Sequence, residues 1–148
     1  METEFKKHSV FTARILLGII FFAAGASKVI NPLLFAEIIM NYQIVPDYLV
    51  NLTAFFLPYL EITIAIMLIS GLFLEGAVII SLILLISFGG SLIFNLARGL
   101  NISCGCFTSV AEEATNLDYI YYIARDIVFI FIASYLAREV FFTKISKS

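Results

Sequence analysis

Long apolar segments separated by short polar stretches make up most of the chain. Four of them have the length of membrane-spanning helices, at residues 10–29, 49–70, 77–97 and 119–137. Each is close to the roughly 20 residues that a helix needs to cross the hydrocarbon core of a bilayer. The third contains no charged residue, whereas Glu61 interrupts the second and Arg125 and Asp126 interrupt the fourth. The pattern predicts an all-α integral membrane four-helix bundle, forming one transmembrane domain over residues 1–148.

A shorter amphipathic segment separates the first two spans. Asn31 is a residue type that caps helices, and Pro32 suits a first helical position because its missing N–H is not needed there. Apolar or aromatic side chains then recur at helical spacing at Phe35, Ile38, Ile39 and Tyr42. We predict a short interfacial helix along the membrane surface that ends before Pro46. An ordinary amphipathic connector has the same pattern.

The overall composition agrees with a lipid environment. Hydrophobic residues make up 61% of the 148 residues and charged residues only 14%, so the lipid bilayer is the expected partner. The formal net charge is -2, and the chain contains no run of basic residues. Nucleic acid is therefore excluded as a partner, because phosphate binding needs clustered Lys and Arg.

The basic residues predict the orientation. Six of the nine flank the two ends of the chain, at Lys6, Lys7, Arg14, Arg138, Lys144 and Lys147. By the positive-inside rule, both termini are cytoplasmic and both longer connections lie outside a bacterial inner membrane. A rival interpretation is a signal peptide, since two lysines precede an apolar run that ends in Ala24-Gly25-Ala26. Cleavage there would leave three helices.

Cys104 and Cys106 are the two cysteines of the chain, and Gly105 alone separates them. A disulfide between them closes a small ring near the long end of the usual Cα separation, which predicts strain. A strained disulfide is more oxidising than a structural one, and cross-linking so short a loop stabilises little. Gly105 supplies the backbone freedom that a tight ring needs. The spacing favours catalytic thiol–disulfide exchange on the extracytoplasmic side, where disulfides persist.

A single cysteine pair cannot pass electrons to a second pair within the chain, so an external partner is needed. Either a thioredoxin-like protein exchanges with the pair, or a membrane quinone accepts the electrons, or both act in sequence. Two other functions fit the same residues. Two thiolates suit a soft ion such as Cu(I) or Hg(II), and the chain could equally be a structural subunit that anchors an oxidoreductase. No metal site with four ligands is predicted, because His8 lies on the opposite side in this topology.

Charged residues inside the predicted spans call for inward-facing pairs, because an unpaired charge costs about 2.5–3.5 kcal/mol on insertion scales. At 1.5 Å per residue, Arg14 lies roughly 6 Å and Glu61 roughly 12 Å from the cytoplasmic boundary, which predicts that they pair. Near the outer boundary, Lys28 or Arg98 is predicted to reach Asp126. Such pairs either hold the helices in register or line a proton path or a polar binding pocket.

These residues resemble a known family, the MauE branch (methylamine utilisation) of the DoxX-like membrane proteins. The matching pattern is Arg14, Leu17, Gly18, Gly25, Lys28, Pro32, Phe35, Tyr42, Pro46, Leu57, Pro58, Glu61, Gly99, Cys104-Gly105-Cys106-Phe107 and Arg125-Asp126. The resemblance implies a four-helix inner-membrane protein that works with a periplasmic thioredoxin-like partner as exported enzymes mature. It also implies that Gly105 and Phe107 support the cysteine loop. Family members often have Gly after this stretch, where Thr108 stands here, so the resemblance covers the cysteine pair but not the detailed loop geometry.

Overall fold

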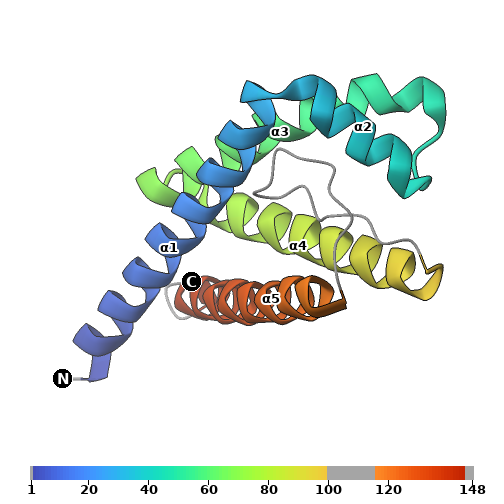
Figure 1. Ribbon diagram of the computed structural model, residues 1–148. Coiled ribbons are helices and arrows are strands. Elements are labelled where there is room, and N and C mark those ends of the chain that lie inside the picture. The colour runs from blue at the N-terminus through green and yellow to red at the C-terminus, as the bar shows by residue number, and fades with distance from the viewer. Residues whose placement is uncertain (1, 100–115, 146–148) are drawn as a thin grey trace.

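The structure is a computed structural model that describes residues 2–99 and 116–145, with side chains described for residues 7–99 and 120–142. Its five helices, in chain order, are α1 (Glu2–Ile30), α2 (Pro32–Tyr42), α3 (Asp47–Ser70), α4 (Leu74–Ala97) and α5 (Asn116–Ile145). They account for almost all of the described chain (Figure 1). The prediction of an all-α fold with a short helix between the first two spans is therefore confirmed.

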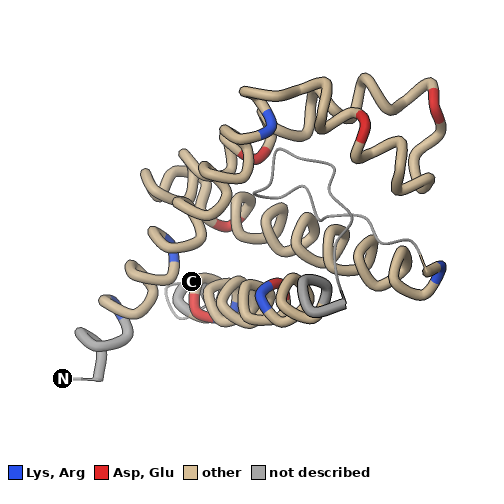
Figure 2. The backbone as a smooth tube through the Cα atoms, in the orientation of Figure 1, with Lys and Arg blue, Asp and Glu red and all other residues tan. Residues whose placement is uncertain are grey.

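Four of these helices are long and apolar enough to cross a membrane, and they contain the four predicted spans. The spanning segments are Lys7–Ile30, Asp47–Ser70, Leu74–Ala97 and Ile120–Phe142. Charged positions are sparse along them (Figure 2). Large apolar side chains cover their outer surface, for example Phe131, which is 72% exposed. A surface of this kind is stable in lipid and not in water, so the chain is a multi-pass membrane protein.

The outer two helices are longer than the sequence predicts. α1 begins at Glu2 and α5 ends at Ile145, whereas the predicted spans begin at residue 10 and end at residue 137. Charged residues at these ends lower the hydropathy but still favour helix, because Glu, Lys and Arg have high helix propensity. Hydropathy therefore located the membrane layer, and the helices continue beyond it.

The short helix α2 differs from the prediction in its cap. Asn31 occupies the N-cap position, but its side chain makes no capping hydrogen bond; its backbone carbonyl instead accepts from the N–H of Phe35 at 3.2 Å. The helix ends at Gln43, which has the left-handed φ of 51° and donates its N–H to the Met40 carbonyl. α2 packs on the start of α3, where Phe35 lies in a buried cluster with Val50. Its position along a bilayer surface stays a prediction.

The helices pack chiefly in two pairs, α1 along α3 and α4 along α5. Figure 1 shows α4 and α5 running side by side in opposite directions, with α1 at an oblique angle to both. The core where the four spans meet contains Leu17 of α1, Ile64 and Leu68 of α3, Val78 of α4 and Leu136 of α5, all nearly or fully buried. Because the core is made by all four spans, it fixes their rotation and so determines which polar side chains point inward.

The closest approach between α1 and α3 depends on Gly18 and Gly25. A Cβ atom at Gly25 would lie 2.8 Å from Cγ1 of Ile62 and 2.9 Å from the backbone carbonyl of Pro58. At Gly18 it would lie 2.6 Å from a side-chain atom of Ile69. Small residues of this kind let helix backbones approach closely in lipid.

Substitution of Gly25 by alanine is expected to separate α1 from α3 and to lower stability by about 1–3 kcal/mol, the usual cost of overpacking. The matched control is Gly90→Ala, because a Cβ atom at Gly90 of α4 meets nothing within 4 Å; it should be neutral or slightly stabilising. Thermal unfolding of the purified proteins in detergent measures both. Equal melting temperatures for the two variants would show that α1 and α3 do not meet at Gly25.

Candidate functional site

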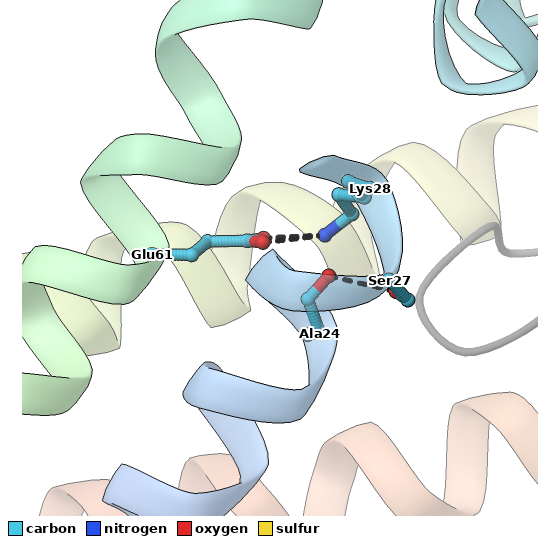
Figure 3. A network of polar contacts seen from close by, with 4 residues as sticks. All are labelled: Ala24, Ser27, Lys28 and Glu61. Carbon is cyan, nitrogen blue, oxygen red and sulfur yellow. Dashed lines mark hydrogen bonds and ion pairs between the residues drawn. The ribbon is translucent and has the colours of Figure 1, made fainter. Parts of the chain in front are cut away.

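A buried ion pair joins the end of α1 to the middle of α3. Nζ of Lys28 lies 2.5 Å from Oε1 and 2.7 Å from Oε2 of Glu61, and the two side chains are 3% and 1% exposed. Figure 3 shows them pointing toward each other across the gap between the helices. Lys28 also stands in the last turn of α1, where a cation complements the partial negative charge of a helix C-terminus. Each charge therefore has a partner in a region where water is excluded.

Two aromatic rings enclose the ammonium group of Lys28. Its Nζ lies 5.2 Å from the ring centroid of Phe35 in α2 and 5.1 Å from that of Phe88 in α4. Both distances are within the range for cation–π attraction, which is stronger where the cation is shielded from water. Lys28 belongs to α1 and contacts side chains of α2, α3 and α4. This one residue therefore connects four helices.

A second ion pair lies within α5. Nη2 of Arg125 is 3.1 Å from Oδ1 of Asp126, with the side chains 13% and 5% exposed. The guanidinium of Arg125 also lies 5.5 Å from the Tyr122 ring centroid and 5.8 Å from that of Phe129. Oδ2 of Asp126 is buried and has no hydrogen-bond partner among the described residues. This oxygen is a free acceptor inside the bundle.

One small cavity brings the two ion pairs together. Lys28, Glu61, Arg125 and Asp126 all line it, with apolar side chains of α1, α4 and α5 between them. Its volume is about 30 Å³, whereas a water molecule needs at least about 10–15 Å³ and several polar partners. The cavity can therefore hold a water molecule that donates to Oδ2 of Asp126. Such a water would also lie near the Lys28–Glu61 pair, which makes this charged cavity a candidate site for proton transfer.

The predicted pairing of Arg14 with Glu61 is wrong. Nη2 of Arg14 lies 3.4 Å from the backbone carbonyl of Ile69, and its guanidinium packs on Gly71, where α3 ends with a left-handed φ of 79°. Arg14 thus binds a carbonyl that the helix end leaves without an intrahelical partner. Glu61 pairs instead with Lys28.

The reason for this error is the register between α1 and α3. The prediction measured the depth of each charged residue from the end of its predicted span. In the structure, the close contacts between α1 and α3 place Gly18 against Ile69 and Gly25 against Glu61. Helical side chains also lean toward the N-terminus of their own helix. In antiparallel helices, Lys28 and Glu61 therefore lean toward each other, which closes the axial distance between their Cα atoms.

The predicted contact of Lys28 or Arg98 with Asp126 is also wrong, although Lys28 does lie near Asp126. Asp126 bonds its chain neighbour Arg125, while Lys28 lines the same cavity without bonding to it. Arg98 lies elsewhere: its Nη2 donates to Oε1 of Gln43 at 2.9 Å. That bond ties the end of α4 to the turn after α2.

The structure does not describe residues 100–115, so Cys104, Gly105, Cys106 and Phe107 lie outside the described part of the chain. The helices on either side of this segment are described: α4 ends at Ala97 and α5 begins at Asn116.

Sequence reasoning missed two features of the described helices. Asn95 of α4 is 0% exposed, and neither polar atom of its side chain has a hydrogen-bond partner among the described residues. Phe35 and Phe88 were not recognised as the rings that enclose Lys28. A signal for Asn95 was available, because an amide in an otherwise apolar span is expensive and normally faces the bundle interior. No local signal could have identified the two phenylalanines among the 15 in the chain.

Comparison with known proteins agrees with this architecture. The family model described as methylamine utilisation protein MauE matches residues 6–138. The methylamine utilization protein MauE of Paracoccus denitrificans is 31% identical over 108 residues, which are 72% of this chain and 58% of that protein. The chain thus spans less than two thirds of the length of this relative. No solved structure gives a significant match.

Proposed function

Because the chain belongs to the family of methylamine utilisation protein MauE, we propose that it is a membrane thiol–disulfide redox protein. Its reacting groups are Cys104 and Cys106, which cycle between dithiol and disulfide. One sulfur attacks or is attacked by a sulfur of a thioredoxin-like partner, and the other resolves the mixed disulfide. The observation on which this proposal rests is that the chain has two cysteines and a single glycine between them.

The packing of the described helices supports the orientation in this proposal. At one end of the bundle, Gly71 at the end of α3 and Glu75 at the start of α4 line a common pocket with Val140, near the end of α5, and Arg14 of α1 packs on Gly71. At the other end, Arg98 bonds Gln43. The end of α5 therefore lies at the first end of the bundle, and the end of α4 lies at the second. With cytoplasmic termini in a bacterial inner membrane, the connection that follows α4 is extracytoplasmic.

The charged cavity has a matching role in this proposal. Oxidation of two thiols to a disulfide releases two protons together with two electrons. The carboxylates of Glu61 and Asp126 line one water-sized cavity inside the bundle, where they can accept and release protons. The Lys28–Glu61 pair also holds α1 and α3 in a fixed register, whereas Arg14 and Arg98 bond groups at helix ends. Lys28, Glu61, Arg125 and Asp126 act as supporting site residues in this proposal.

The pathway that we propose is methylamine utilisation, for which the Paracoccus relative is named. In that setting the protein would introduce or exchange disulfides in an exported protein as it matures. The thioredoxin-like partner would shuttle oxidising equivalents between Cys104 or Cys106 and that exported protein.

Trapping of a mixed disulfide tests the proposal directly. Either Cys104→Ser or Cys106→Ser is expected to form a covalent complex with a thioredoxin-fold protein whose own resolving cysteine is replaced, because no second thiol remains to release it. Non-reducing electrophoresis and mass spectrometry detect the complex, and an impermeant maleimide applied to intact cells should label the remaining cysteine.

The control is the variant that lacks both cysteines, which should neither be trapped nor labelled. Absence of any complex with both single variants would contradict the proposal, as would labelling only after the membrane is broken. Stoichiometric binding of Cu(I) or Hg(II) without exchange would favour the carrier alternative, and full function of the double variant would favour the structural subunit.

A further inference from the structure

A second, larger pocket lies between α2, α3 and α4. Among its lining residues are Phe35, Ile38 and Tyr42 of α2, Thr53 of α3, and Phe88 and Ser91 of α4. We call it the α2 pocket. Its volume is about 120 Å³, close to the roughly 150 Å³ of an engineered apolar cavity that binds benzene. The α2 pocket therefore has room for one six-membered ring.

The lining of the α2 pocket combines flat apolar walls with hydroxyl groups. The rings of Phe35 and Phe88 come from two different helices, and hydroxyls come from Tyr42, Thr53 and Ser91. The Ser91 hydroxyl donates to the Ser87 carbonyl at 2.8 Å, so it can only accept a further bond. The Thr53 hydroxyl is half-buried and lines the same pocket. The pocket thus offers a hydroxyl donor to a ring that has acceptor atoms.

The α2 pocket shares a wall with the charged cavity. Phe88 lines both, and the ammonium of Lys28 lies 5.1 Å and 5.2 Å from the centroids of Phe88 and Phe35. The positive charge of Lys28 is therefore close behind the two aromatic walls. Because Glu61 compensates this charge, the pair acts on the pocket as a dipole, and the ammonium is the end that contacts the two rings.

We propose that the α2 pocket binds the ring of a lipid quinone. A quinone ring is flat and apolar, and its two carbonyl oxygens accept hydrogen bonds, whereas a lipid acyl chain gains nothing from a hydroxyl donor. A quinone also reaches the pocket through the lipid in which the bundle lies.

The redox role of the bound quinone rests on the proposed function. Oxidation of the Cys104 and Cys106 thiols to their disulfide releases two electrons and two protons, and reduction of one quinone to the quinol consumes the same number. Ser91 is less than two turns before Ala97, the last residue of α4, or about 9 Å along the helix axis at 1.5 Å per residue. The α2 pocket is therefore near the end of the helix from which the chain leads to the cysteines.

Photo-cross-linking of the full-length protein in lipid nanodiscs tests the site, with an azido derivative of decylubiquinone as the probe. We expect mass spectrometry to find the label on α2 or on the second half of α4, and unmodified decylubiquinone to compete. Decane added at the same concentration should not compete. Label that is confined to other helices would overturn the inference, as would equal competition by decane.

Three variants make the test sharper. Ser91→Phe fills the α2 pocket and is expected to weaken decylubiquinone binding at least tenfold, whereas Ser87→Phe, one turn earlier on an exposed face of α4, should leave it unchanged. Thr53→Val removes one hydroxyl without changing the shape and should weaken binding roughly fivefold, the value of one hydrogen bond. Unchanged binding in both Ser91→Phe and Thr53→Val would overturn the inference.

The double variant Cys104→Ser and Cys106→Ser separates this inference from the proposed function. It should still bind the probe, since no described residue of the α2 pocket is a cysteine. Quinone binding without thiol–disulfide exchange in the parent protein would leave the site in place and refute the proposed function. Exchange without quinone binding would refute the site alone.

Discussion

The Glu61→Ala variant is expected to lose about 3–5 kcal/mol of stability, the usual result of removing one partner from a buried ion pair. The lost carboxylate leaves the ammonium of Lys28, which is 3% exposed, without its counter-ion and enclosed by the rings of Phe35 and Phe88. Thermal unfolding in detergent and the yield of membrane-inserted protein measure the effect. Glu37→Ala, on an exposed position of α2, is the control and should change neither.

The double variant Lys28→Met and Glu61→Met shows whether the pair stabilises or functions. Replacing a buried ion pair with apolar residues of similar size is often neutral or stabilising, so we expect the double variant to recover most of the loss seen in Glu61→Ala. If thiol–disulfide exchange is nevertheless slower in the recovered protein, the charges act in function as well as in folding. A Glu61→Ala protein as stable as the parent would show that the two side chains do not form a buried pair.

Loss of both cysteines is expected to abolish exchange completely while the helices stay folded. A serine hydroxyl neither attacks a disulfide nor forms one, and the chain has no further cysteine to replace the pair. The measurement is a single turnover: oxidised protein is mixed with a reduced thioredoxin-fold substrate, and the parent should convert one dithiol per molecule. The double serine variant should leave the substrate at its uncatalysed rate of oxidation.

Helix content and melting temperature are the controls for that experiment, because a short disulfide loop contributes little stability. The two proteins should agree in both quantities. Substrate oxidation at the parental rate by the double serine variant would exclude Cys104 and Cys106 as the reacting groups and would favour a structural role for the protein.

The spans could be predicted well because their signal is local. A stretch such as Leu74–Ala97, which has no charged residue after Glu75, forms a helix in lipid whatever its neighbours are, since its backbone must satisfy its own hydrogen bonds. The short helix α2 was predictable for a similar reason, because Pro32 and the spacing of its apolar residues act within one segment. Helix ends were less predictable, since α1 and α5 continue past the apolar layer.

The charge pairs could not be predicted from depth alone. Glu61 has Arg14 and Lys28 on the same neighbouring helix, and the choice between them depends on how far α1 slides along α3. That register is set by the fit of Gly18 and Gly25 against α3, which is a property of two surfaces and not of either sequence segment. The rotation of α1 matters equally, because it points Lys28 inward, where its side chain is 3% exposed.

By itself, the sequence determined that this protein lies in a membrane and that it has four spans and a short connecting helix. Hydrophobicity and residue spacing act along the chain, so they can be read without knowing what packs on what. Only the tertiary structure decided that Lys28 pairs with Glu61, that both share a cavity with Arg125 and Asp126, and that α2 encloses a ring-sized pocket. These features join residues from three or four helices, and close packing of the whole bundle decides which of them meet.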